Sequence, residues 1–482
     1  MPSEPVASMQ TPPETYFAAT AVPHAPRPRL TLETDTNVCI VGAGMAGLWI
    51  ARELVRRRYD VVVLEAGRIA HGASGRNGGF CSAGFAQELP TLVERVGLDH
   101  ARALYRLSRE GVERVREFLG EGMPGLDPTA GRLNVRRYAD ADEIRREAAL
   151  LAEQFDHDVV VWPTERVRET LKTDSYFQAL HEADALNLHP LNLALALAAE
   201  IERGDGRIYE ESPVVAADLD GVRKWVETGT EARRIRVRAH QIVLCGSAGL
   251  GAAFPEFSRC ILPVATHVGV TAPLGEKLKE AIRYRGGIAD TRRAFDYYRV
   301  LGDRLMWGGH MTTRTRRPRR LARMLKRDIL KVYPQLGEVA IEYSWTGTMG
   351  YAVHRMPQIG LLRPGVWIAS AFGGQGVNTT AMAGDLIASA IAENDDRWRL
   401  FIPFGMVWAG GMLGRAAAQI SYWSMAMRDR IEERLAHRAE ARRKEEKARA
   451  AENARLERLA VRAQAAKPLA TERKKAKPAK AD

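Results

Sequence analysis

Three glycines at fixed spacing are the first residues in this sequence that indicate chemistry. They follow the uninterrupted apolar run 38–41 in the pattern Gly-x-Gly-x-x-Gly. In a strand–turn–helix unit the first glycine allows the tight turn, the second lets the backbone approach a pyrophosphate, and the third lets the helix pack on the strand. The start of the helix then offers N–H groups and the positive end of its dipole to phosphate. The sequence therefore predicts a dinucleotide site at Gly42, Ala43, Gly44, Met45, Ala46 and Gly47.

An acidic residue about twenty positions further on completes this pattern. Glu65 follows a second apolar run, 61–64, and precedes Ala66. A carboxylate at that strand end accepts hydrogen bonds from ribose hydroxyls and repels a 2′-phosphate, which disfavours NADP. The alternative is a glycine turn in a core strand that binds nothing. The sequence contains a strand, the three glycines, a helix, a second strand and the acidic residue at the expected spacing. This combination favours a dinucleotide site over a turn without a ligand.

The loop 66–79 is too rich in glycine and small polar residues to be core. Its backbone N–H groups and the guanidinium of Arg76 suit an anion such as a pyrophosphate. A surface loop without a ligand is the alternative interpretation.

A second glycine-rich turn lies far along the chain. The apolar run 366–370 is followed by a segment that opens a helix reaching about residue 392. A helix N-terminus aimed at the N1 and C2 edge of a flavin would stabilise the negative charge that develops there on reduction. Alone, this pattern could be a well-packed turn. With the first motif it favours a flavin over a nicotinamide, held here by Gly374, Gln375, Gly376, Val377 and Asn378.

The elements that must position these turns read as two sheets. Residues 214–215, 235–237 and 241–245, the last ending in Gly246, return the chain to the sheet of the first motif. Residues 262–271, 295–300 and 304–307 alternate in short strands and indicate an antiparallel sheet. Strands at 132–138 and 159–162, with helices at 91–122 and between them, indicate a second domain. The predicted class is α/β.

Bulk composition bounds the function further. The chain has 482 residues, 46% of them hydrophobic, and a net charge of +12. Residues 432–482 contain 16 Lys and Arg against 9 Asp and Glu, a net +7, so the body is only weakly basic and gives no reason to expect nucleic acid. Cys39, Cys81, Cys245 and Cys260 form no metal-binding or disulfide pattern, so we expect no metal and a reducing compartment.

The ends of the chain carry no targeting signal that we recognise. The N-terminus is rich in proline and lacks the apolar core of a signal peptide, and no run of about eighteen uncharged apolar residues predicts a membrane span. We expect a cytoplasmic protein. Near the C-terminus one helix face should pack on the body: Leu413, Ala417, Ile420, Trp423 and Met427. Beyond Arg434 we expect a solvated, partly formed helix, with pairs such as Glu440 with Lys444, that could touch acidic surfaces weakly. The basic run 314–320 is expected to be a solvated charge run.

These motifs together resemble the D-amino-acid-oxidase-like superfamily of FAD-dependent amine oxidoreductases, in particular the branch of gamma-glutamylputrescine oxidoreductase-like amine oxidases. The resemblance spans roughly residues 14–428. It rests on Val41-Gly42-Ala43-Gly44-Met45-Ala46-Gly47, Leu64-Glu65-Ala66, Ala73-Ser74-Gly75-Arg76-Asn77-Gly78-Gly79, Tyr297-Tyr298-Arg299, Trp307-Gly308-Gly309 and Phe372-Gly373-Gly374-Gln375-Gly376-Val377-Asn378-Thr379-Thr380.

The resemblance implies a Rossmann-like, discontinuous FAD-binding domain with an inserted α+β antiparallel-sheet substrate domain. We assign 1–30 to an extended arm; 31–110, 186–256 and 340–395 to the FAD-binding domain; 111–185 and 257–339 to the substrate domain; 396–430 to a helical extension; and 431–482 to a basic tail. By position Glu65 would bind the ribose, Val214 the adenine through its backbone, and Ser74, Arg76, Asn77 and Gly78 the phosphates and ring edge.

Two positions depart from the family pattern. Gln375 stands where a histidine is common, and His354 precedes the proline turn where aspartate is frequent. Some members of the family attach the flavin covalently through a cysteine of the second domain. No cysteine lies near Trp307 here, so the FAD is expected to be non-covalent. Tyr297, Tyr298, His354 and His267 are candidates for lining the substrate pocket.

The function that the resemblance implies is oxidation of a C–N bond in an amine, either gamma-glutamylputrescine-like or an N-substituted amino acid. Hydride would pass to flavin N5, the imine would hydrolyse to a carbonyl, and O2 would become H2O2. Two alternatives remain: an FAD amine dehydrogenase that passes electrons to a quinone or carrier, and a non-catalytic flavoprotein that serves as an assembly factor.

Overall fold

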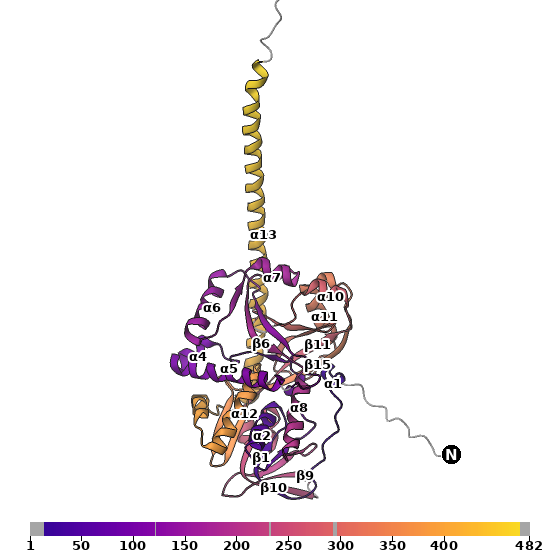
Figure 1. The fold of residues 1–482 in the computed structure, drawn as a ribbon, viewed down its shortest axis with the longest axis vertical. Helices are drawn as coiled ribbons and strands as arrows, with labels where there is room; N and C mark the ends of the chain where they lie inside the picture. The colour runs from indigo at the N-terminus through magenta and orange to yellow at the C-terminus, as the bar shows by residue number, and fades with distance from the viewer. Residues whose placement is uncertain (1–13, 121, 231–232, 293–295, 473–482) are drawn as a thin grey trace, which may run out of the picture. The chain divides into compact units, whose positions relative to one another are not determined.

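The computed structural model describes residues 14–120, 122–230, 233–292 and 296–472. The chain divides into two units, Met1–Ala426 and Met427–Asp482. Within the first unit, Figure 1 shows one sheet with β1 and β10 in the lower part and a second sheet with β6, β11 and β15 above it.

The first sheet is the parallel sheet that the glycine motif predicts. Its order is β16-β17-β10-β1-β2-β7, with β9 paired to β10 and β8 paired to β9. The pairs of β1 with β10, β1 with β2, β10 with β17 and β2 with β7 are parallel. Its strands are β1 (Thr34–Val41), β2 (Val61–Leu64), β7 (Arg207–Tyr209), β8 (Val214–Asp218), β9 (Lys224–Thr230), β10 (Arg233–Leu244), β16 (Gln358–Arg363) and β17 (Val366–Ser370).

Two helices from distant parts of the sequence cover this sheet side by side. Helix α2 (Met45–Arg56) packs on α12 (Gly376–Glu393) and on α8 (Pro190–Arg203). In α12 every residue from Val377 to Ala390 is buried, because α5 (Leu98–Gly120) covers its other side. The last four residues of β1 are also buried, since the sheet is covered on both faces. The α/β prediction is confirmed.

The second sheet is largely antiparallel. Its order is β15-β11-β14-β13-β12-β4-β6-β3, with β5 attached to β6, and among the described strands of this second sheet only β4 and β12 pair in parallel. The strands are β3 (Phe80–Cys81), β4 (Thr129–Val135), β5 (Val160–Trp162), β6 (Ala179–Asn187), β11 (Leu262–Thr271), β12 (Gly287–Asp290), β13 (Tyr297–Leu301), β14 (Arg304–Thr312) and β15 (Ile341–Tyr351).

Strand β15 departs from the domain boundary drawn on the sequence. Residues 340–395 were assigned to the FAD-binding domain, yet β15 pairs with β11 from Leu262↔Tyr351 to Thr271↔Ile341 in the second sheet. Pairing along a whole strand satisfies the backbone hydrogen bonds of both strands. No local pattern in 341–351 indicates which of the two sheets the strand will join.

The remaining helices differ in part from the sequence prediction. The loop 66–79 contains a short helix, and the helix predicted for 91–122 is split at Gly97, whose φ is 82°. These helices are α1 (Tyr16–Ala19), α3 (Ala73–Arg76), α4 (Leu89–Val96), α6 (Ala141–Phe155), α7 (Thr164–Leu171), α9 (Pro255–Ser258), α10 (Glu276–Ala281), α11 (Leu321–Val332) and α13 (Gly411–Glu472), with 3₁₀ turns at Ser247–Gly249, Gly251–Ala253, Pro334–Leu336 and Arg397–Phe404.

The prediction that one face of the C-terminal helix packs on the body is wrong. Leu413, Ile420 and Trp423 are 81%, 63% and 56% exposed, and Ala417 and Met427 are also exposed. Polar groups make contacts with the body instead: buried Gln419 accepts hydrogen bonds from Thr312 and Thr313, and the Arg415 guanidinium donates to the carbonyl oxygen of Thr313. A buried polar side chain that accepts hydrogen bonds from backbone N–H and hydroxyl groups can hold a helix in place as well as an apolar side chain can.

The second unit continues α13 as a helix through Glu472. The predicted pair of Glu440 with Lys444 is present at 3.2 Å. The helix is complete over the described residues rather than partly formed, because its alanine, arginine, lysine and glutamate residues are strong helix formers.

Deleting residues 435–482 should leave flavin content and turnover within about a few-fold of the full chain, because most of the described side chains of the deleted helix are exposed and none is buried. Flavin absorbance per polypeptide and steady-state rates measure this. Loss of bound flavin in the truncated protein would contradict it.

Over the described ranges no helix is long and apolar enough to cross a bilayer. The same ranges contain no cluster of three or more His, Cys, Asp or Glu residues arranged to hold a metal ion.

Candidate functional site

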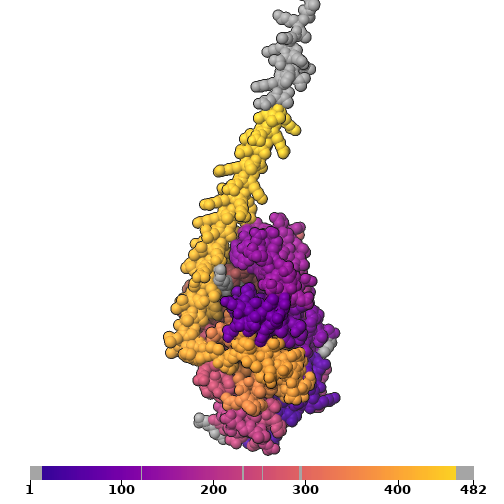
Figure 2. Space-filling view, turned by 90° about the vertical axis from the view of Figure 1, so that its left-hand side faces the viewer, coloured from indigo at the N-terminus to yellow at the C-terminus, as the bar shows by residue number. Residues whose placement is uncertain are grey.

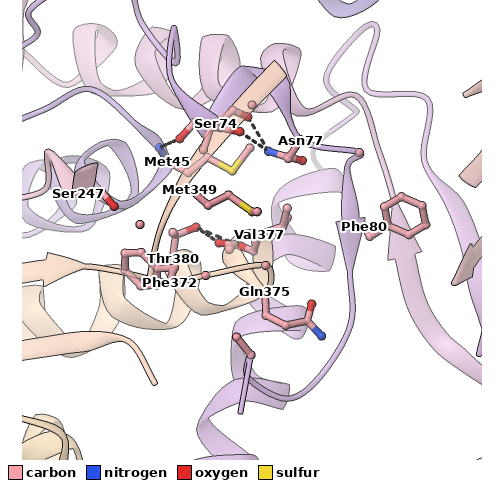
Figure 3. A pocket seen from close by; sticks show the side chains of 18 of the residues that line it. Met45, Ser74, Asn77, Phe80, Ser247, Met349, Phe372, Gln375, Val377 and Thr380 are labelled. Atoms are coloured by element: carbon pink, nitrogen blue, oxygen red, sulfur yellow. Dashed lines mark hydrogen bonds between the residues drawn. The ribbon is translucent and has the colours of Figure 1, made fainter. Parts of the chain in front are cut away.

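The two glycine-rich turns meet at one cavity of about 300 Å³. The start of α2 and the loop 73–78 form one side, and the turn before α12 forms the opposite side (Figure 3). The second sheet contributes β4, β11, β13 and β15 to the wall. This is the volume range of small-molecule sites. Of the predicted cofactor residues, the cavity is lined by Gly44, Met45, Ala46, Ser74, Arg76, Asn77, Gly78, Gly374, Gln375, Gly376 and Val377.

The first glycine turn is as tight as its pattern requires. Gly42 has φ 108°, and a Cβ there would lie 3.1 Å from the carbonyl group of Cys245, the residue that follows β10. A Cβ on Gly47 would lie 2.0 Å from the carbonyl oxygen of Gly42. Helix α2 can therefore start against β1 only with glycine at both positions, and its first-turn N–H groups, which have no partner inside the helix, point at the cavity end.

Glu65 closes this turn from the end of β2. Its two carboxylate oxygens accept hydrogen bonds from the N–H groups of Ala43 and Gly67, each at 2.8 Å. The backbone oxygen of Glu65 accepts a hydrogen bond from the N–H of Ser212, two residues before Val214. This bond brings the residue predicted to bind the ribose close to the residue predicted to bind the adenine. Each carboxylate oxygen retains a further lone pair for a ribose hydroxyl. Glu65, Ala66 and Val214 lie outside the cavity lining, as do Gly42, Ala43, Gly47 and Gly246.

The loop 73–78 is held by its own side chains. Ser74 Oγ accepts from the N–H of Met45 at 2.9 Å, and Asn77 Nδ2 donates to the carbonyl oxygens of Ala73 and Ser74, as Figure 3 shows. Arg76 lines the cavity, but its guanidinium donates to Glu14 at 2.5 Å and to the carbonyl oxygen of His71. The Arg76 hydrogen bond lowers the pKa of Glu14, which keeps that carboxylate charged. Arg76 is thus a paired cation here rather than the free anion-binding group that the sequence predicted.

The second glycine turn places the start of α12 at the cavity. Val377 is 4% exposed and lines the wall, and Thr380 Oγ1 donates to the carbonyl oxygen of Gly376 at 2.6 Å. The turn begins at Ala371, a non-glycine residue with φ 57°, and Ser247 and Arg355 at the cavity also have positive φ. Strained backbone of this kind clusters at binding sites, where the surrounding structure holds it in place.

Asn378 does not lie under the cavity as the sequence predicted. Its side chain is 1% exposed, and Nδ2 donates to the carbonyl oxygens of Gly84 and Ser108, joining α12 to α5. The side chain points into the helix interface because it follows Val377 by one residue, about 100° around the helix.

Asn378→Asp should therefore destabilise the fold by about 3 kcal/mol rather than selectively slow the chemistry, because a buried carboxylate would face two carbonyl oxygens. Chemical denaturation measures the change. The matched control is Asn37→Asp, since the exposed Asn37 uses only its Oδ1, which accepts from Asp60 N–H and survives the change. Equal stability of the two variants would contradict the assignment.

Tyr297 is the one predicted pocket residue that lines the cavity. Its ring lies over Gly308, where a Cβ would be 2.2 Å from Tyr297 Cζ, which explains the Trp307-Gly308-Gly309 pattern. Its hydroxyl lies 3.2 Å from Thr266 Oγ1. Burial raises the pKa of Tyr297 to about 12, so the phenol is neutral at pH 7.

The structure places the other three pocket candidates elsewhere. Tyr298 faces the opposite side of β13, stacks on Trp307 with ring centroids 4.3 Å apart, and bonds Tyr333. His267 is 3% exposed and bonds Thr346 Oγ1 at 2.9 Å. His354 caps its own turn by accepting from the N–H of Met356. Strand alternation explains Tyr298: adjacent residues point to opposite faces, and pairing decides which face is the cavity.

Two buried histidines make stability depend on pH. Burial lowers the pKa of His189 and of His267 to about 4. Neutral His189 accepts from Asn192 N–H as the N-cap of α8. A lowered histidine pKa means that the unfolded chain binds protons first, so stability is full above about pH 6.5 and falls towards pH 4 by up to about 1.4 kcal/mol per pH unit per histidine.

Urea denaturation between pH 7 and 4 measures this slope. In His189→Asn, which retains a capping acceptor, the slope should be smaller. An unchanged slope would contradict the role of His189.

Several lining residues carried no local signal. They are Ser247 after β10, Arg132 on β4, Thr266 on β11, Arg355 after β15, and Gly347, Met349, Gly350 and Tyr351 on β15. Figure 3 shows Met349 between Ser74 and Val377, across the space between the two turns. The pairing of β15 with β11 brings the residues of these two strands to the cavity, while Arg132 arrives through the pairing of β4 with β6 and β12.

Comparison with known proteins defines the class. Residues 37–390 match the model of the DAO family, "FAD dependent oxidoreductase". The chain belongs to this family of FAD-dependent oxidoreductases.

The chain is 32% identical to gamma-glutamylputrescine oxidoreductase of Escherichia coli over 396 residues, which cover 80% of this chain and 90% of that protein. It is 30% identical to the probable oxidoreductase OrdL of Haemophilus influenzae, over 78% and 87% of the two chains. Glycine oxidase from Geobacillus kaustophilus has a similar fold, with a TM-score of 0.64 at 19% identity over 78% of this chain and 99% of that one.

The residues present fit FAD. The tight turn that Gly42 and Gly47 allow places the start of α2 at the cavity, where its N–H groups suit a pyrophosphate, and the start of α12 faces the same cavity. Cys245 also lines the cavity. Burial raises the pKa of its thiol, which therefore stays protonated.

Proposed function

We propose that the protein oxidises a C–N bond of an amine with non-covalent FAD and O2. The carrying observation is that the N-terminal ends of α2 and α12 converge on one cavity in a chain that is 32% identical to gamma-glutamylputrescine oxidoreductase. FAD would accept hydride at N5 from the carbon beside the nitrogen and reduce O2 to H2O2, while the substrate imine hydrolyses to a carbonyl. The substrate class is a gamma-glutamylputrescine-like amine or an N-substituted amino acid.

The two sheets divide this task. The first sheet, with α2, Glu65 and the loop 73–78, would hold the adenosine and pyrophosphate. The start of α12 would lie at the ring and stabilise negative charge on it. The second sheet would position the amine, with Tyr297 and Thr266 as neutral hydrogen-bonding groups and Phe80, Met349 and Phe372 as apolar wall that excludes water.

The charges at the cavity favour a neutral amine. The described lining contains Arg132, Arg355 and Arg76, the last of which is paired with Glu14, but no aspartate, glutamate, histidine or lysine. An ammonium group would meet cations without a carboxylate to receive its proton. The substrate must therefore arrive deprotonated, and turnover should rise with pH until the amine is neutral.

Anaerobic stopped-flow bleaching of the flavin tests the proposal. The panel contains gamma-glutamylputrescine, N-alkyl glycines, other primary and secondary amines, 2-hydroxy acids and NAD(P)H, and peroxide is measured when O2 is admitted. Bleaching by hydroxy acids or NAD(P)H alone would refute the amine assignment. Bleaching by amines with reoxidation only by a quinone would favour a dehydrogenase, and no bleaching at all would favour the non-catalytic alternative.

A further inference from the structure

A stripe of large apolar side chains is exposed at the surface of the first unit. It consists of Trp408, Met412, Leu413, Ile420 and Trp423, which are 63%, 87%, 81%, 63% and 56% exposed. With 100° between successive helix residues, the four on α13 fall within an arc of about 100°. In Figure 2 the orange atoms before and at the start of α13 lie on the surface of this unit. Exposed apolar groups gathered in this way mark an interaction site.

A segment with five arginines borders this stripe. Residues 314–320 include Arg314, Arg316, Arg317, Arg319 and Arg320, all exposed. The guanidinium of Arg314 lies over the ring of Trp423, 5.5 Å from its centroid. Thr313 and Gln419 hold the two segments together, with Thr313 N–H donating to Gln419 Oε1 at 2.9 Å. Within the described ranges no carboxylate forms an ion pair with Arg314, Arg316, Arg319 or Arg320.

We propose that the apolar stripe and the arginine segment together form a docking surface for an anionic lipid bilayer. Two exposed tryptophans beside long aliphatic side chains suit the boundary between head groups and acyl chains. The arginines that form no ion pair suit phosphate head groups, because an anionic surface attracts basic side chains close to it. The protein would bind peripherally, with the helix axis along the surface.

The charge distribution favours a bilayer over a second copy of the chain. A two-fold interface pairs a patch with itself. An interface over the apolar stripe would bring the arginine segments of both copies together without carboxylates between them, and such like charges are costly. An anionic surface neutralises the same arginines.

Sedimentation of the full chain with vesicles tests the proposal. The protein should bind vesicles that contain phosphatidylglycerol and bind phosphatidylcholine vesicles at least about tenfold more weakly, with affinity falling as salt rises. Because the basic second unit could also bind anionic lipid, two sets of variants separate the surface from it.

The first set changes apolar groups without changing charge. The triple variant Trp408→Ser, Leu413→Ser, Ile420→Ser should bind anionic vesicles at least about tenfold more weakly. Its control, Leu32→Ser, Val160→Ser, Val222→Ser, removes exposed apolar side chains elsewhere and should bind like the wild type.

The second set removes charge. The variant is Arg314→Gln, Arg316→Gln, Arg319→Gln, Arg320→Gln. Its control removes the same number of charges at other exposed positions: Arg146→Gln, Arg223→Gln, Arg234→Gln, Lys277→Gln.

Flavin content of every variant shows that it is folded. Weaker binding by both surface variants but neither control supports the proposal. Equal binding by all five proteins, or no vesicle binding by the wild type, overturns it. A dimer in light scattering that the apolar triple variant converts to a monomer, without vesicle binding, overturns it in favour of a second copy.

Discussion

Gly47→Ala should lower the flavin content of the purified protein at least about tenfold. The new Cβ would lie 2.0 Å from the carbonyl oxygen of Gly42 and 3.2 Å from Ile40 Cγ2, and the first of these contacts is with backbone that cannot move away. Helix α2 must then shift from β1, which displaces the first-turn N–H groups that would bind the pyrophosphate. Absorbance at the flavin band per polypeptide measures the loss.

Two glycine variants serve as graded controls. Gly120→Ala, at the end of α5, has nothing within 4 Å of its Cβ and should retain full flavin content. In Gly44→Ala the Cβ would meet only the Ser74 hydroxyl, at 3.0 Å, so an intermediate loss is expected because a side chain can turn away. Full flavin in Gly47→Ala would show that the glycine turn does not position the cofactor.

Glu65→Arg should weaken FAD binding by the apoprotein at least about a hundredfold. The change removes the acceptor for Ala43 N–H and Gly67 N–H, each at 2.8 Å, and sets a cation at the place proposed for the ribose. Titration of the apoprotein with FAD, followed by flavin fluorescence, gives the dissociation constant. Acid precipitation of the wild type should release the flavin as FAD.

Two variants separate the carboxylate from its charge. Glu65→Gln keeps an oxygen acceptor and should bind FAD better than Glu65→Arg does. Glu94→Arg makes the same charge change at an exposed position of α4 and should bind FAD like the wild type. If Glu94→Arg weakened FAD binding as much as Glu65→Arg, net charge rather than the ribose contact would be responsible.

The exposed stripe on α13 and the cavity face of β13 show how far sequence patterns reach. Periodicity correctly placed Leu413, Ile420 and Trp423 on one helix face, but a helix pattern does not say whether that face meets protein or solvent. Likewise, alternation predicts that Tyr297 and Tyr298 point to opposite sides of a strand, while the stacking of Tyr298 on Trp307 decides which side is core.

The sequence by itself determined the two glycine turns, Glu65, the α/β class and the family, because each motif behind them lies within a short stretch of the chain. The contact of Gly47 with Gly42 spans only five residues, so local sequence suffices to encode it. Only the tertiary structure decided that Met349 and Arg132 reach the cavity, that Arg76 is paired with Glu14, and that Asn378 joins α12 to α5. Those contacts join segments far apart in the chain, and strand register and helix packing, which no local pattern encodes, bring them together.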